Sequence, residues 1–110
     1  MLNKWTNALK PEDTKLKEFE MLKYFVTGYF NTGYSWSELE ERTIAFRDDE
    51  KPEYTIQLKR SLSKLQELIN NGDQKRWVEV QKYIYELSMR DLEFKRGQEF
   101  IDRVNNALDS

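Results

Sequence analysis

The sequence predicts an all-α fold, a single compact bundle of about five short helices. Three observations support this prediction. Apolar residues recur every three or four positions almost throughout, which is the spacing that places them on one face of a helix. Short turn signals rich in Gly, Asn, Asp or Pro separate the segments with this spacing. No segment shows the alternation of apolar and polar residues that is typical of a half-buried strand.

The first predicted helix covers residues 11–30. Pro11 suits a first helical position, and the two acidic residues after it complement the positive end of the helix dipole. The turn at residues 31–33 ends the helix, because its glycine can adopt the left-handed conformation that closes a last turn. Residues 1–10 are interpreted as a loosely packed N-terminal segment of the single domain, residues 1–110. The apolar face of this helix comprises Leu16, Phe19, Leu22, Phe25, Val26, Tyr29 and Phe30.

The second predicted helix has the clearest start signal. Residues 35–38, Ser-Trp-Ser-Glu, match a capping box, in which the first and last side chains each bond the other residue's backbone amide. Tyr34 and Leu39 occupy the positions of a hydrophobic staple. The helix is predicted to run to about Asp48, and Pro52 marks the next boundary because the residue before proline disfavours helical geometry. Its expected inward residues are Leu39, Thr43 and Phe46.

Three further helices are predicted after Pro52. The third ends at the Asn-Asn-Gly turn of residues 70–72, and Asp73 is the expected N-cap of the fourth. A loop is expected at residues 88–95, and the fifth helix at 96–107. The predicted inward residues are Leu58, Leu62, Leu65, Leu68 and Ile69 in the third helix, Trp77, Val80, Tyr83, Ile84 and Leu87 in the fourth, and Phe100, Ile101, Val104 and Leu108 in the fifth.

The residue types that are missing exclude much of enzyme chemistry. The chain has no cysteine and no histidine, so disulfides, thiolate or imidazole metal sites and Ser/His or Cys/His nucleophiles are excluded. Glu38 and Glu41 could hold a hard cation, but no loop has the ligand spacing of a calcium-binding hand. The four glycines are scattered and form no phosphate-binding loop. We therefore expect no catalytic, metal or cofactor site, and a protein that is not an enzyme.

The same composition predicts a cytoplasmic protein. The first residues contain no apolar signal-peptide core, and the longest uncharged run, residues 24–37, is too short and too polar to span a bilayer. The absence of cysteine suits a reducing compartment. We expect no membrane contact.

Negative charge is concentrated in one segment. The chain has a net charge of −2, and residues 38–53 hold seven acids against three bases, a net of −4, which leaves +2 for the remainder. An acidic protein repels nucleic acid, and this segment would attract a basic protein partner. The plainer interpretation is an ordinary solvated helix face. With two aromatic residues at the helix entry as anchors, the candidate partner-binding residues are Tyr34, Trp36, Glu38, Glu40, Glu41, Asp48, Asp49 and Glu50.

An alternative is a small helical regulatory or adaptor module that contacts nucleic acid. Basic residues cluster on the third helix and at the start of the fourth, and the turn at residues 70–73 could join a helix-turn-helix pair. Interspersed acids and the negative total charge disfavour this alternative. The basic residues are Lys59, Arg60, Lys64, Lys75 and Arg76.

One segment resembles a known family. Residues 22–30, Leu-Lys-Tyr-Phe-Val-Thr-Gly-Tyr-Phe, resemble the start of a bacterial immunity-protein family from contact-dependent growth inhibition systems, whose members carry a small-Tyr-Phe signature at the end of the first main helix. An acidic helix (37–49), a leucine-rich helix with a Gly/Asp turn (58–73) and an Arg/Gly-led last helix (96–108) follow in the family's order. Family members often have histidine and an acid where this chain has Asn31 and Thr32, and a Tyr-Pro-rich connection where it has residues 89–95.

The resemblance implies a protein that binds and neutralises the C-terminal toxin domain, commonly a nuclease, of such an effector. It implies a monomer that forms a one-to-one heterodimer with its toxin and has no direct contact with nucleic acid. The acidic helix would then imitate a phosphate backbone, and reversing Glu40, Glu41 and Asp48 should weaken toxin binding. Gly28-Tyr29-Phe30 is interpreted as architecture, with Gly28 permitting a close helix approach and the two rings packed inward.

Overall fold

Residues 16–110 are described by the structure, which is a computed structural model. The predicted start of the first helix at Pro11 and the segment 1–10 lie outside the described residues. Within residues 16–110 the chain forms five α-helices and three short 3-10 turns, which confirms the predicted all-α bundle. The elements are η1 Lys17–Phe19, α3 Glu20–Tyr29, η2 Trp36–Glu38, α4 Leu39–Asp49, α5 Pro52–Asn70, α6 Gln74–Ser88, η3 Phe94–Arg96 and α7 Gly97–Leu108.

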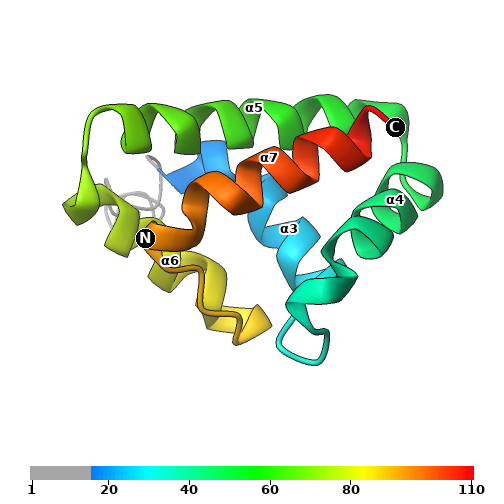
Figure 1. The fold of residues 1–110 in the computed structure, drawn as a ribbon, viewed down its shortest axis with the longest axis horizontal. Coiled ribbons are helices and arrows are strands. Elements are labelled where there is room, and N and C mark those ends of the chain that lie inside the picture. The colour runs from blue at the N-terminus through cyan, green and yellow to red at the C-terminus, as the bar shows by residue number, and fades with distance from the viewer. Residues whose placement is uncertain (1–15) are drawn as a thin grey trace, which may run out of the picture.

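The helices pack as one antiparallel pair with the other helices crossing it or covering its ends. The longest, α5, lies antiparallel to α7, and α3 crosses behind this pair (Figure 1). At one end of the molecule α4 packs against α7 and α3, and at the other end α6 packs against α3 and α5. The central position of α3 therefore gives it contacts with α4, α5 and α6.

Large rings fill the core where these helices meet. Phe25 packs edge-on against Phe46, with ring centroids 5.2 Å apart, which is a favoured geometry for two aromatic rings. The predicted inward residues of α7 are all buried, as are the three central leucines of α5. The fully buried rings are those of Phe19, Phe25, Phe30, Phe46, Trp77 and Phe100.

The helix starts follow the local signals in the sequence. The capping box is present: Ser35 and Glu38 satisfy each other's backbone amides as predicted. Asp73 is the N-cap of α6, with its side chain accepting from the Arg76 amide at 3.1 Å. The end of α6 lacks a glycine, and Met89 adopts the left-handed conformation there with φ of 54°.

Two predictions about packing were wrong. Leu87 is 68% exposed, because Ser88 takes the next inward position of α6 and donates its hydroxyl to the Ile84 carbonyl at 2.7 Å. Gly28 is exposed, and a Cβ added there would meet nothing within 4 Å. The glycine that permits a close approach is Gly97, where a Cβ would lie 2.5 Å from the Trp77 ring.

Candidate protein-binding site

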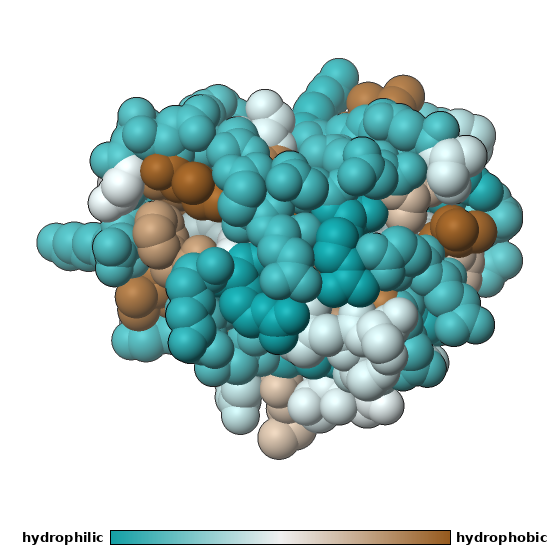
Figure 2. Space-filling view, viewed as in Figure 1, coloured by the Kyte–Doolittle hydropathy of each residue, from teal (hydrophilic) through white to brown (hydrophobic). Residues whose placement is uncertain are grey.

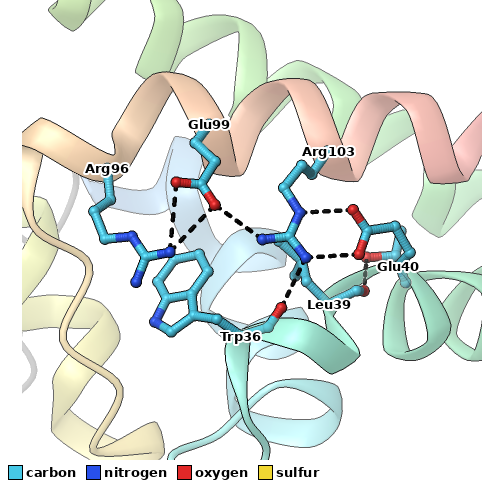
Figure 3. A network of polar contacts seen from close by, with 7 residues as sticks. Trp36, Leu39, Glu40, Arg96, Glu99 and Arg103 are labelled. Carbon is cyan, nitrogen blue, oxygen red and sulfur yellow. Dashed lines mark hydrogen bonds and ion pairs between the residues drawn. The ribbon is translucent and has the colours of Figure 1, made fainter.

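Trp36 is partly buried against the core at the N-terminal end of α4. Its ring lies edge-on to Phe30 and Phe100, with centroids 5.3 Å and 6.2 Å away. The guanidinium of Arg96 lies over its face, 3.8 Å from the ring centroid (Figure 3). The predicted aromatic anchor is therefore already covered by residues of its own chain.

Glu40 is paired with an arginine from α7. Arg103 donates to both carboxylate oxygens, at 2.6 Å and 2.7 Å, and also to the Trp36 carbonyl at 2.8 Å (Figure 3). Glu99 accepts from Arg103 at 2.9 Å and from Arg96 at 3.2 Å, which extends the network along α7. The Arg103 hydrogen bonds lower the pKa of Glu40, and those from Arg96 and Arg103 lower the pKa of Glu99. These charges join α4 to α7, and the face that they cover is largely hydrophilic (Figure 2).

Tyr34 and Glu38 also have partners within the chain. The Arg42 guanidinium lies 4.3 Å from the centre of the Tyr34 ring, and its Nε donates to the Tyr29 carbonyl at 2.8 Å. Glu38 accepts from the Ser35 amide at 2.8 Å as part of the capping box. Tyr34, Trp36, Glu38 and Glu40 therefore stabilise the turn and the start of α4.

Arg90 is a buried cation that sequence reasoning missed. It is 8% exposed and donates to the carbonyls of Phe30, Asn31 and Tyr34, at 3.1 Å and 2.8 Å for the first two. It also lies over the Phe30 ring at 4.0 Å, and burial lowers its pKa. A cation at the C-terminal end of α3 meets the negative end of the helix dipole. Nothing in the loop sequence around Arg90 distinguishes it from a solvent-exposed arginine.

The acids at the other end of α4 are more accessible. Asp48 pairs with the adjacent Arg47 at 2.9 Å, whereas Asp49 is exposed and forms no ion pair with a described residue. Glu41 lies in the first turn of α4, and it is also exposed without an ion pair to a described residue. Glu50 follows the last turn of α4. Its Oε2 accepts from the hydroxyls of Tyr24, at 2.8 Å, and Tyr29, at 2.6 Å.

These tyrosines and Glu50 form part of one groove between α3, α6 and the end of α4. The groove has a volume of about 430 Å³. Tyr24 and Leu87 give it an exposed apolar wall, with 45% and 68% of each residue accessible. The Thr27 hydroxyl oxygen is buried without a hydrogen bond from a described residue. The lining residues are Glu20, Lys23, Tyr24, Thr27, Gly28, Tyr29, Glu50, Tyr83 and Leu87. We call this the Tyr24–Glu50 groove.

The carboxylate of Glu50 raises the pKa of both tyrosines. Its hydrogen bond is the main cause of the raised pKa of Tyr24. The pKa of Tyr29 is raised chiefly by burial and then by the same carboxylate. At neutral pH both hydroxyls therefore donate, and they orient Glu50 toward α3.

Three of the five basic residues that the sequence singled out on α5 and α6 have acidic neighbours, whereas Arg60 and Lys75 form no ion pair with a described residue. Lys59 pairs with Asp109, and Arg76 pairs with Glu79 at 2.8 Å. Lys64 lies 3.7 Å from Glu67. These pairs neutralise part of the basic cluster that a nucleic-acid-contacting module would use. Within residues 16–110 no acidic residues gather as a metal-binding group, and no helix is long and apolar enough to cross a membrane.

Comparisons with family models, curated proteins and solved structures found no match to this chain.

Proposed function

We propose that this chain is an immunity protein that binds and neutralises the C-terminal toxin domain of a contact-dependent growth inhibition effector. The observation that supports this proposal best is the Tyr24–Glu50 groove, an apolar hollow next to the exposed acids at the end of α4. The resemblance of residues 22–30 to such immunity proteins supplies the class of partner.

The groove has the two features that protein interfaces combine. Partly exposed aromatic and aliphatic side chains provide the apolar centre, and here these are Tyr24 and Leu87. Charges at the rim steer the partner and exclude wrong ones. Asp49 and Glu50 give this rim a negative sign, which suits the basic surface of a nuclease toxin.

The part of the acidic helix that would imitate a phosphate backbone is smaller than the sequence predicts. Glu40 is neutralised by Arg103, so its reversal would weaken the contact between the start of α4 and α7 as well as change the charge. Glu41 and Asp49 are exposed without ion pairs among the described residues, and they are the better positions for charge reversal.

Co-expression with the upstream gene product tests the proposal. The chain is produced together with the C-terminal domain of the protein encoded immediately upstream, and the mixture is analysed by size-exclusion chromatography. We expect a one-to-one complex, and rescue of cells that express the toxin domain alone. Two folded proteins that elute separately, with no rescue of growth, would refute the immunity function.

A further inference from the structure

We infer that the Tyr24–Glu50 groove receives an arginine side chain of the protein partner, with Glu50 and the Tyr24 ring as its two contacts. This inference rests on the proposed function and specifies the chemistry of the contact. It concerns a carboxylate that accepts hydrogen bonds but has no cationic partner within residues 16–110.

The carboxylate of Glu50 has unused capacity. Both tyrosine hydroxyls bond the same oxygen, Oε2, and no described residue donates to Oε1. An ionised carboxylate has about four acceptor positions on its two oxygens. No lysine or arginine of residues 16–110 forms an ion pair with Glu50, so the negative charge in the groove is uncompensated there.

Lys23, a cation that lines the groove, already has partners within the chain. Lys23 pairs with Glu86 at 2.5 Å, and its Nζ lies 4.2 Å from the centre of the Tyr83 ring. It therefore has both a carboxylate and an aromatic face as partners. Lys23 leaves Glu50 available to a cation from outside the described chain.

The same protein shows how an arginine uses such a pair of contacts. Arg96 lies 3.8 Å over the Trp36 ring while donating to Glu99 at 3.2 Å. A guanidinium combines stacking on a ring with hydrogen bonds to a carboxylate because it is planar and carries donors along its edges. Tyr24 and Glu50 present the same two partners, a ring and a carboxylate, without the arginine.

The groove also suits the aliphatic stem of an arginine. Tyr24 is held by its hydroxyl bond to Glu50 and by edge-on contact with Tyr54, with ring centroids 5.7 Å apart, yet 45% of it remains exposed. The open backbone at Gly28 and the exposed Leu87 border the same groove. Arginine and lysine bury their methylene stems on such apolar surface while the charged end meets a carboxylate. We commit to arginine because stacking on a ring favours guanidinium over ammonium.

Titration of the full chain with a short peptide tests the inference without a toxin. The probe is acetyl-Gly-Arg-Gly-amide, and its neutral match carries citrulline, which has the same shape without the charge. We expect the arginine peptide to shift the ring NMR signals of Tyr24 and Tyr29 in a saturable manner, and the citrulline peptide to bind roughly tenfold more weakly. Equal binding of the two peptides would overturn the inference.

Variants of the chain provide the second half of the test. Glu50→Gln keeps acceptors for both tyrosines and removes the charge, so it should weaken arginine-peptide binding severalfold. Tyr24→Leu, at an exposed ring, should do the same. Asp102→Asn on α7 removes one exposed carboxylate elsewhere and should leave binding unchanged. Unchanged binding in the Glu50 variant, with a native circular dichroism spectrum, would exclude the carboxylate as the contact.

The outcomes separate this inference from the proposed function. Specific arginine-peptide binding without a toxin complex would support the groove contact and refute immunity. A toxin complex whose affinity is the same for Glu50→Gln as for the unmodified chain would support immunity and overturn the arginine contact.

Discussion

The two ends of α4 carry similar residues and have opposite environments. At the start of the helix, the partly buried Trp36 and Glu40 contact Arg96 and Arg103 from η3 and α7. At its end, Asp49 is exposed and Glu50 is bonded only to neutral tyrosine hydroxyls among the described residues. Charge density along the chain therefore does not identify a binding surface. Whether an acid is available to a partner depends on whether a basic residue from another helix forms an ion pair with it.

The largest effect that this comparison predicts is loss of stability at the closed end. Trp36→Ala should lower the free energy of unfolding by about 3 kcal/mol, because the ring fills space between Phe30 and Phe100. Urea denaturation measures the change. Tyr24→Ala at the open end is the matched control and should move the midpoint far less. Equal shifts for the two variants would contradict the division between a closed and an open end.

Two glycines provide a second test, because one is packed against another side chain and the other borders open space. Gly97→Ala should destabilise the protein by about 1–3 kcal/mol, since its Cβ would lie 2.5 Å from the Trp77 ring. Gly28→Ala should stabilise it by about 0.5 kcal/mol, because alanine is the better helix former and meets nothing there. Thermal unfolding of the two variants measures both changes in stability. Destabilisation by Gly28→Ala would mean that the groove is filled.

At the open end the expected effect is on partner binding. Glu50→Gln should weaken the complex with the toxin domain about tenfold, about 1.4 kcal/mol, because the partner's cation loses its carboxylate. Glu41→Gln, at an exposed site outside the Tyr24–Glu50 groove, should change affinity about twofold and mainly through association rate. Surface plasmon resonance at two salt concentrations measures both. A larger effect for Glu41 than for Glu50 would move the interface to the first turn of α4.

The smallest expected effect is the acid dependence of the closed end. Arg103 lowers the pKa of Glu40, so the pair stabilises the fold above the ordinary glutamate pKa of about 4.5 and loses this contribution as pH falls through the lowered value. Glu40 is partly exposed, so screening limits the pair to about 1 kcal/mol. Arg103→Met should therefore be less stable than the unmodified chain at pH 7, and the gap should shrink toward pH 3. A gap that is constant with pH would exclude the ion pair as its source.

Local interactions made the helices predictable. The capping box at Ser35 and Glu38 joins residues three apart, and so does the bond from the Arg76 amide to Asp73. The apolar stripes were predicted for the same reason, since the helical repeat alone places them on one face. Leu87 shows the limit of this reasoning. Its spacing fits the apolar stripe of α6, but in the last turn the inward position is occupied by Ser88. The Ser88 side chain is buried there and donates to the Ile84 carbonyl.

The helical class, the helix starts and most of the core follow from the amino-acid sequence, because these depend on neighbours within one or two turns. Which acids are available to a partner depends on how the helices pack. Arg103 reaches Glu40 across 63 residues, and Tyr24 reaches Glu50 across 26. Residues so far apart meet only when helices cross, so their pairing depends on the angles at which α3, α4 and α7 pack. Those packing angles divide one acidic stretch into a structural end and an open end.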